Sequence, residues 1–193
     1  MKKRHPPALA TALALLLLVL FLSQAAPPRA LAAGSPPPAS PAEGDSYRRA
    51  FDWTGADKQA RHIDFALAKA DVRNELSQFG VPRGMESTLM FEKRGFQRVA
   101  VYQGKEIYMV DYAGIFRRNL GYFPGLTAAL RQALAPLPAT GALLAEFLFF
   151  VQTVRYQKPP YYYGNKFINS FFPPLVCLYE QYGDCDCKSL LLA

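Results

Sequence analysis

One stretch of the sequence reads Tyr182-Gly183-Asp184-Cys185-Asp186-Cys187-Lys188-Ser189-Leu190-Leu191-Leu192-Ala193. The glycine is a turn signal, and Asp184 after it suits a helix N-cap, because its carboxylate can accept a backbone N–H two or three residues on. The pattern predicts a helix with Cys185 in its first turn. There the free N–H groups and the helix dipole favour a thiolate, the nucleophilic form of cysteine. A buried, inert cysteine near a helix start is the alternative.

Residues 183–193 resemble the nucleophile segment of bacterial transglutaminase-like proteins, which belong to the same broad class as papain-like cysteine peptidases. In that family a Gly-x-Cys sequence opens the core helix, often as Gly-Asp-Cys-Asp-x-Lys-x-Leu-Leu-Leu-Ala. Residues 150–156 resemble the helix that precedes the cysteine helix in such proteins. The proline-bearing stretch before the cysteine also resembles the corresponding part of the family. The resemblance covers about residues 143–193 well and the earlier chain only loosely.

The resemblance implies that Cys185 is the catalytic nucleophile. It also implies a histidine and an aspartate after the cysteine helix, and the chain stops at Ala193 inside that helix. The expectation is therefore an incomplete core, truncated within the helix and inactive without those partners. His62 comes before the cysteine, on the expected solvent side of a strand, and is read as an exposed strand residue. The family usually has a small hydroxyl residue where Cys187 stands.

The composition argues against a nucleic-acid partner. The 193 residues are 51% hydrophobic, enough to build a core for one domain and a short extra segment. The net charge is +7, but four basic residues precede the expected processing site: Lys2, Lys3, Arg4 and Arg29. Without them, 18 basic residues face 15 acidic ones. A nearly balanced chain without a basic cluster does not indicate nucleic-acid binding.

Residues 1–32 have the pattern of a signal peptide. Basic residues at positions 2–4 precede an apolar run over 8–22, and Ala30-Leu31-Ala32 is a small-x-small cleavage site. The apolar run is shorter than the ~20 residues that a spanning helix needs. The pattern predicts a cleaved signal and a periplasmic or secreted protein, with a retained membrane anchor as the alternative. Such a compartment is oxidising.

Residues 33–46 are rich in proline, glycine, serine and alanine and are expected to be a linker. Residues 47–120 are expected to form a small α+β segment. Polar and apolar residues alternate over 61–67, which predicts a half-buried strand, and 69–79 reads as a helix. Residues 96–102 and 106–112 are rich in β-branched and aromatic residues and flank a short glycine turn, which predicts a hairpin. Because two strands rarely stand alone, the expected partners are the 61–67 strand and residues 87–91.

Two helices are expected next. Residues 126–134 form an amphipathic pattern that stops at Pro136. Residues 141–156 are apolar on nearly all sides, which is typical of a core helix. Gln152 is its polar exception, and a side-chain amide can help to hold the oxyanion in cysteine-peptidase chemistry. Gln152 is therefore the second candidate catalytic residue; a glutamine satisfied by nearby backbone is the alternative.

The last part of the chain contains a long loop and three cysteines whose pairing the sequence leaves open. Residues 157–174 carry a tyrosine run that could line a groove for an extended polypeptide or pack over the core. A short helix over 175–182 then leads to Gly183. Cys185 and Cys187 are too close in one helix for an unstrained disulfide, whereas Cys177 could pair with either. Zinc is a weak option, because neighbouring residues cannot all converge on one tetrahedral ion.

The sequence predicts an α+β protein in which residues 121–193 form an incomplete transglutaminase-like core. The leading function is an exported cysteine enzyme that hydrolyses amides or transfers acyl groups through the Cys185 thiolate. The alternative is a non-catalytic exported binding or structural protein. A polypeptide is the expected substrate; no cofactor, metal or nucleic acid is expected, and membrane contact is expected only through the N-terminus. The sequence does not indicate an oligomeric state.

Overall fold

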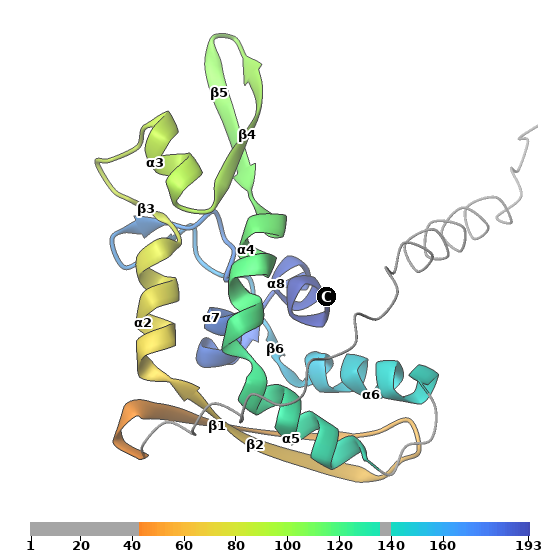
Figure 1. Ribbon diagram of the computed structural model, residues 1–193. Helices are drawn as coiled ribbons and strands as arrows, with labels where there is room; N and C mark the ends of the chain where they lie inside the picture. The colour runs from red at the N-terminus through yellow and green to blue at the C-terminus, as the bar shows by residue number, and fades with distance from the viewer. Residues whose placement is uncertain (1–42, 136–139) are drawn as a thin grey trace, which may run out of the picture. The chain divides into compact units, whose positions relative to one another are not determined.

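The computed structural model describes residues 43–135 and 140–193. The signal peptide, most of the linker and the stop at Pro136 therefore lie outside the described residues. The described chain contains both helices and strands, and its two longest strand pairs are antiparallel hairpins, which confirms the α+β class (Figure 1). The described strands form four small sheets, with the orders β1-β2, β3-β8-β7, β4-β5 and β6-β9.

The first element pair is an antiparallel hairpin. A 3-10 turn, η1 (Glu43–Asp45), leads into β1 (Ser46–Thr54), which pairs with β2 (Ala60–Ala68). The large apolar side chains of both strands face inward, and those that are buried are Phe51, Trp53, Ile63, Phe65 and Leu67. His62 and Asp64 are exposed, so the predicted strand and its facing are confirmed. The last residues assigned to the linker are thus already structured.

The second hairpin forms as predicted, but its expected sheet partners were wrong. β4 (Phe96–Tyr102) pairs with β5 (Lys105–Val110), and positive φ angles at Gln103 and Gly104 match the two-residue turns that suit hairpins. No third described strand joins it. β2 pairs with β1 instead, because β1 offers a matching apolar face, and residues 88–91 lie in helix α3 (Thr88–Lys93). Ser87 caps that helix by accepting from the Met90 N–H at 3.4 Å.

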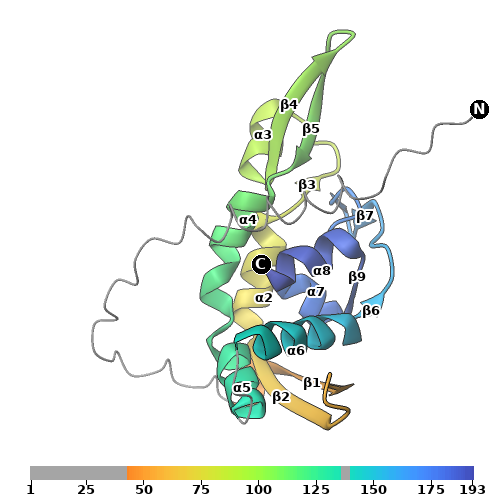
Figure 2. The same ribbon diagram turned by 90° about the vertical axis from the view of Figure 1, so that its right-hand side faces the viewer.

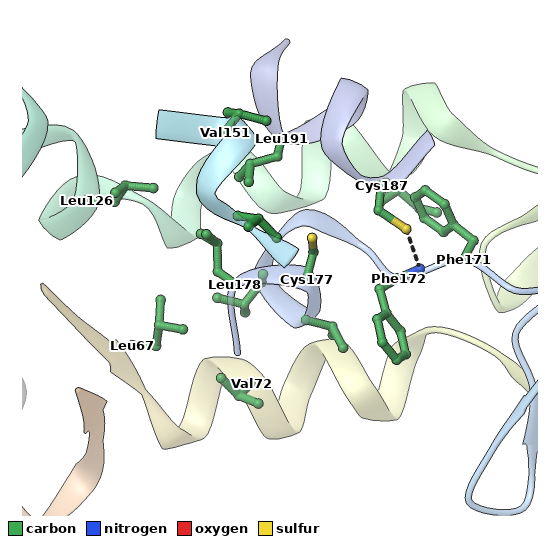
Figure 3. Packing of buried hydrophobic residues seen from close by; sticks show 14 of the residues in the cluster. Leu67, Val72, Leu126, Val151, Phe171, Phe172, Cys177, Leu178, Cys187 and Leu191 are labelled. Atoms are coloured by element: carbon green, nitrogen blue, oxygen red, sulfur yellow. Dashed lines mark hydrogen bonds between the residues drawn. The ribbon is translucent and has the colours of Figure 1, made fainter. Parts of the chain in front are cut away.

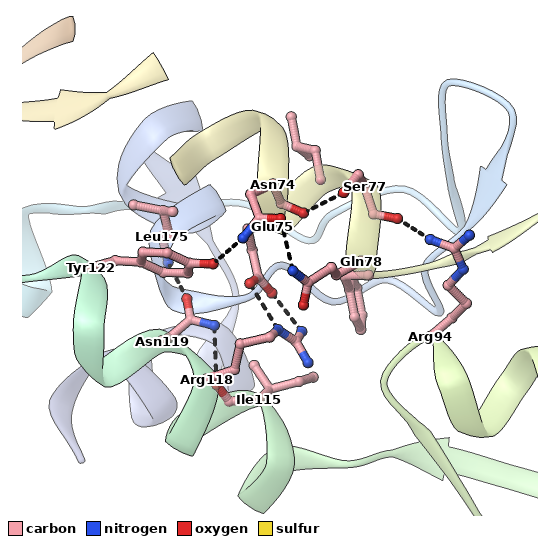
Figure 4. Close-up of polar contacts among 12 residues, drawn as sticks. Asn74, Glu75, Ser77, Gln78, Arg94, Ile115, Arg118, Asn119, Tyr122 and Leu175 are labelled. Carbon is pink, nitrogen blue, oxygen red and sulfur yellow. Dashed lines mark hydrogen bonds and ion pairs between the residues drawn. The ribbon is translucent and has the colours of Figure 1, made fainter. Parts of the chain in front are cut away.

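Two helices run between the hairpins and share a buried ion pair. α2 (Lys69–Gln78) matches the prediction, and α4 (Tyr112–Asn119) begins where β5 was expected to continue. Asp111 caps α4 by accepting from the Gly114 N–H at 2.9 Å, which explains why the strand ends there. Glu75 of α2 is completely buried, and both its oxygens accept from Arg118 of α4, at 2.9 and 2.7 Å (Figure 4).

The helices α5 and α6 pack against the first hairpin, α5 on β2 and α6 on β1 (Figure 2). A short 3-10 turn, η2 (Leu120–Tyr122), precedes α5 (Pro124–Leu134). α5 buries Leu126 and Leu130 of the expected apolar face and half-buries Ala129 and Ala133, and it also buries Leu134, which was not expected on that face. α6 (Thr140–Thr153) was expected to be buried all round, and this is wrong. Its inner face is buried through Phe150 and Val151, whereas Leu144 on its outer face is 63% exposed.

α6 also carries a buried carboxylate that the sequence pattern did not reveal. Glu146 is 2% exposed and accepts hydrogen bonds from the Trp53 indole at 3.1 Å and the Ala56 N–H at 2.8 Å. Arg61 lies 3.1 Å from the same carboxylate. A Cβ on Gly55 would meet the Glu146 oxygens at 2.5 and 2.6 Å. The glycine in this turn therefore makes room for the buried acid.

The long loop after α6 contains short strands. β6 (Arg155–Tyr156) follows α6 directly, and β7 (Tyr162–Tyr163) and β8 (Lys166–Phe167) form a hairpin that pairs with β3 (Val81–Pro82). Tyr162 stays exposed, and the half-buried Tyr163 packs against Phe172, with their ring centres 5.4 Å apart. The tyrosine run is thus partly surface and partly packing.

The chain then enters its last two helices. α7 (Pro174–Glu180) ends at Gln181, which has a positive φ of 60°. β9 (Tyr182–Gly183) pairs in parallel with β6 and leads into α8 (Cys185–Leu192). One apolar core unites residues on both sides of position 120, from Phe51 to Leu191. Within 43–135 and 140–193, no helix has the length and apolar character needed to cross a membrane.

Candidate nucleophile site

Cys185 opens α8, as the sequence predicted. The Asp184 carboxylate accepts from the Cys187 N–H at 3.2 Å and so caps the helix. The parallel pairing of β9 with β6 fixes the chain immediately before this cap, since the Gln157 N–H also donates to the Gly183 carbonyl at 3.2 Å. Cys185 follows the paired β9 segment and the Asp184 cap, and its side chain is exposed. The structure therefore does not bury this cysteine, which the alternative interpretation expected to be buried.

The other two cysteines are buried under the start of α8. Cys177 of α7 and Cys187 of α8 are both completely buried (Figure 3). The Cys187 sulfur accepts from the Phe172 N–H at 3.3 Å. Burial raises the pKa of the Cys177 thiol to about 12, and burial also raises the pKa of Cys187. Both therefore remain neutral thiols at ordinary pH, and Cys185 is the exposed thiol of the three.

Gly183 is the point where these sulfurs meet. A Cβ at this position would lie 2.8 Å from the Cys177 sulfur, 3.5 Å from the Cys187 sulfur and 2.7 Å from the Cys187 Cβ. The φ angle of Gly183 is not in the left-handed range. A tight turn, which the sequence pattern suggested, is therefore not the reason that a glycine stands at this position. The residue is small because α7 and α8 approach here. All three cysteines are free thiols, and the buried pair lies close to one glycine while Cys185 faces outward.

Lys188 ties α8 to the end of α6. It is only 9% exposed, and its ammonium donates to the Gln152 carbonyl at 3.4 Å. This carbonyl belongs to the last turn of α6, where backbone acceptors are unsatisfied and a positive charge is favourable. Burial lowers the pKa of Lys188, and the nearby Cys177 partly opposes this shift. Sequence reasoning treated Lys188 only as part of a motif and missed this contact.

The Gln152 side chain points away from the core. It is exposed, and no hydrogen bond of its amide is recorded within the part of the chain that the structure describes. The residue comes near the site through its backbone, which accepts from Lys188 one turn beyond Cys185. The structure thus links Gln152 to α8 through its backbone carbonyl, whereas its side-chain amide is exposed.

Asp186 connects the candidate nucleophile to a residue that the sequence did not single out. Its Oδ1 accepts from the Cys185 thiol at a sulfur–oxygen distance of 3.7 Å, and its Oδ2 accepts from the Tyr112 hydroxyl at 3.2 Å. Tyr112 stands in the first turn of α4, and its ring packs on Phe171, with centres 5.3 Å apart. Burial and the Asp186 charge raise the pKa of Tyr112 to about 12, so it stays a donor.

His62 does not belong to this site. Its Nδ1 lies 2.8 Å from the Asp52 carboxylate on the outer face of the first hairpin. That hairpin packs mainly on α5 and α6, whereas α8 packs mainly on α6 and α7. The prediction that His62 is an exposed strand residue is confirmed. Within the described ranges no three histidine, cysteine, aspartate or glutamate residues gather as a metal site.

An apolar groove of about 560 Å³ lies at the other end of α8. Its walls come from α4, α5 and the first half of α6, together with the end of α8. Leu126, Leu130, Phe147, Leu190 and Leu191 are among the residues that line it. Cys185 does not line it, so the groove and the exposed thiol occupy opposite ends of one helix.

No family model, curated protein or solved structure matches this chain.

Proposed function

We propose that Cys185 is the nucleophile of an exported transglutaminase-like cysteine enzyme that acts on carboxamide or peptide carbonyls. One observation carries the proposal: Cys185 is exposed in the first turn of a capped helix, whereas the other two cysteines are buried. That position supplies backbone N–H groups and the positive end of the helix dipole next to the sulfur. The resemblance of residues 183–193 to the family's nucleophile segment supports the same assignment.

The chemistry has two steps. The Cys185 thiolate attacks the carbonyl carbon, the amide nitrogen takes a proton from the solvent or from an added acid, the carbon–nitrogen bond breaks and the amine leaves, which gives a thioester. Water or a second amine then attacks the thioester and returns the thiol. Gln152 is the proposed amide donor to the oxyanion, because its exposed side chain stands on the helix end to which Lys188 binds.

A general base is the missing requirement of this mechanism. His62 pairs with Asp52 on another sheet, and no other histidine lies within the described residues. Without a base and its orienting acid, the rate of nucleophilic catalysis of this type falls to a small fraction of its full value. The proposal therefore expects the 193-residue chain to form a thioester with activated acyl donors but to turn over peptide amides poorly.

The test supplies the base from solution. The full chain is incubated with a peptidyl coumarin amide, with and without imidazole, beside Cys185→Ser, and the acylated residue is located by peptide mass spectrometry. We expect label on Cys185 and amide cleavage that needs both Cys185 and imidazole. Cleavage that persists unchanged in Cys185→Ser, or acylation confined to other residues, would refute the proposal.

A second function, a non-catalytic exported binding protein, is favoured by the exposed apolar surface. Leu144 and Leu148 on the outer face of α6 are 63% and 45% exposed, and the apolar groove opens beside that helix. Monomeric proteins seldom leave contiguous apolar patches of this kind uncovered. If Cys185 proves unreactive towards acyl donors, this reading becomes the better one.

Export belongs to the proposal as well. It rests on the charge, apolar run and cleavage pattern of residues 1–32, all outside the described part of the structure. Expression with the native N-terminus, followed by N-terminal sequencing of the protein found outside the cytoplasm, tests it. A mature N-terminus at Ala33 is the expected result, and an unprocessed chain retained in the cytoplasm would contradict it.

A further inference from the structure

Asp186 lies between two donors that come from different elements. The Cys185 thiol and the Tyr112 hydroxyl bind opposite oxygens of its carboxylate, at 3.7 and 3.2 Å. Asp186 therefore has its first partner on its own helix and its second on α4. A carboxylate with both oxygens engaged has few orientations left, and so does the thiol that depends on it.

The position of Tyr112 is fixed independently of this contact. Asp111 caps α4 immediately before it, and the ring of Tyr112 meets Phe171 nearly edge-on, at an angle of 83°. The next residue, Phe172, donates its N–H to the buried Cys187 sulfur of α8. Tyr112 thus belongs to a packed frame that includes α8 itself, and its hydroxyl is directed at Asp186.

The charge balance around the thiol follows from this arrangement. Among the described residues, Asp184 and Asp186 place two carboxylates beside Cys185, and Tyr112 from α4 provides the facing donor. Lys188 directs its ammonium to the end of α6 instead. A carboxylate next to the sulfur disfavours the thiolate, and a hydroxyl that donates to this carboxylate offsets part of its charge.

We propose that Tyr112 is a positioning residue for the Cys185 nucleophile and acts through Asp186. Its hydroxyl fixes the Asp186 carboxylate, which orients the thiol, and reduces the negative charge that the sulfur experiences. This inference rests on the proposed role of Cys185. The competing explanation is that Asp186 only favours the N-terminus of α8 and that Tyr112 only packs on Phe171.

Alkylation of Cys185 separates the two explanations, since it needs neither a base nor a substrate. The rate with iodoacetamide is measured from pH 6 to 10 for the full chain, Tyr112→Phe, Asp186→Asn and the double variant. Tyr112→Phe keeps the ring on Phe171 and removes only the hydroxyl. Tyr122→Phe and Asp64→Asn are matched controls, because their polar partners are Asn74 and Arg48, on other elements.

The two single substitutions are expected to change the alkylation rate in opposite directions. Asp186→Asn removes a unit charge near the sulfur and should speed alkylation at pH 7 about fivefold, with the pH profile moved to lower pH. Tyr112→Phe leaves the full carboxylate charge and should slow alkylation about twofold. In the Asp186→Asn background, Tyr112→Phe should have no effect, because the group through which it acts is gone.

Two results would overturn the inference. The first is an unchanged pH profile in both single variants while their melting temperatures fall, which is what packing and helix-dipole roles alone predict. The second is an equal effect of Tyr112→Phe with and without Asp186. Neither result bears on whether Cys185 accepts acyl groups, so failure of the positioning role and failure of the proposed function remain distinguishable.

Discussion

Replacing Gly183 with alanine tests the packing that holds the nucleophile helix. The new Cβ would lie 2.7 Å from the Cys187 Cβ and 2.8 Å from the Cys177 sulfur. Carbon atoms in contact prefer separations of about 3.5–4.0 Å, so both contacts are about 1 Å too short. Both neighbours are completely buried and belong to different helices, α7 and α8. The Cys187 Cβ is attached directly to the backbone and cannot turn away, and the Cys177 sulfur could move only by rotating within a fully buried site.

The size of the effect follows from this overlap. Extra methyl groups in a well-packed core cost about 1–3 kcal/mol of folding free energy, and two simultaneous clashes place Gly183→Ala at about 2–3 kcal/mol. In a chain of this length, 1 kcal/mol lowers the melting temperature by about 2–4 °C, so a fall of roughly 4–12 °C is expected. The backbone at Gly183 adds no strain, because its φ is not in the left-handed range.

Urea unfolding followed by circular dichroism measures this free energy. Gly121→Ala is the control, since a Cβ there would have no atom within 4 Å, and it should cost little. Cys177→Ala removes one of the two clashing atoms, so Gly183→Ala should cost about 1 kcal/mol less in that background. The packing argument fails if Gly183→Ala unfolds within about 0.5 kcal/mol of the parent, or if Cys177→Ala leaves its cost unchanged.

Three further outcomes are expected. Arg118→Leu leaves the buried Glu75 carboxylate without its partner and should cost about 3 kcal/mol in the same urea assay, and a cost under about 1 kcal/mol would contradict a buried pair. Maleimide should label Cys185 alone in the folded chain and two more thiols after denaturation, as counted by intact mass. The folded-state pKa values of Cys177 and Tyr112, both about 12, exceed their ordinary values of 9.0 and 10.0. Their contribution to stability is complete below about pH 9 and is lost as pH rises towards 12, so melting temperatures should fall over that window and not between pH 6 and 8.

Local patterns predicted the elements that depend on near neighbours. Alternation over residues 61–67 gave the facing of β2, and the turn residues at 103–104 gave the second hairpin. The Asp184 cap and the place of Cys185 in the first helical turn followed from residue types within three positions of each other. In each case the deciding interaction lies inside a short segment, which is where sequence patterns carry information.

Contacts between distant residues were not predictable in this way. The pairing of β2 with β1, rather than with the second hairpin, depends on which apolar faces meet. No sequence pattern singled out Glu75 or Glu146, yet each is buried because a partner from another element satisfies it. Tyr112 likewise joins the candidate site only because α4 packs beside the loop that precedes α7.

The β4–β5 hairpin has a consequence for the protein in solution. It extends beyond the helices as a two-stranded ribbon, with Val101, Tyr102 and Met109 60%, 65% and 49% exposed (Figures 1 and 2). No described strand pairs with either outer edge, and open edges invite strands from other molecules. The chain has a positive net charge, +7 over all 193 residues, and mutual repulsion opposes such encounters at low ionic strength, less strongly once the four basic residues of 1–32 are removed. Salt screens this repulsion, so dilute, low-salt buffers should keep the protein dispersed and concentrated salt should promote its self-association.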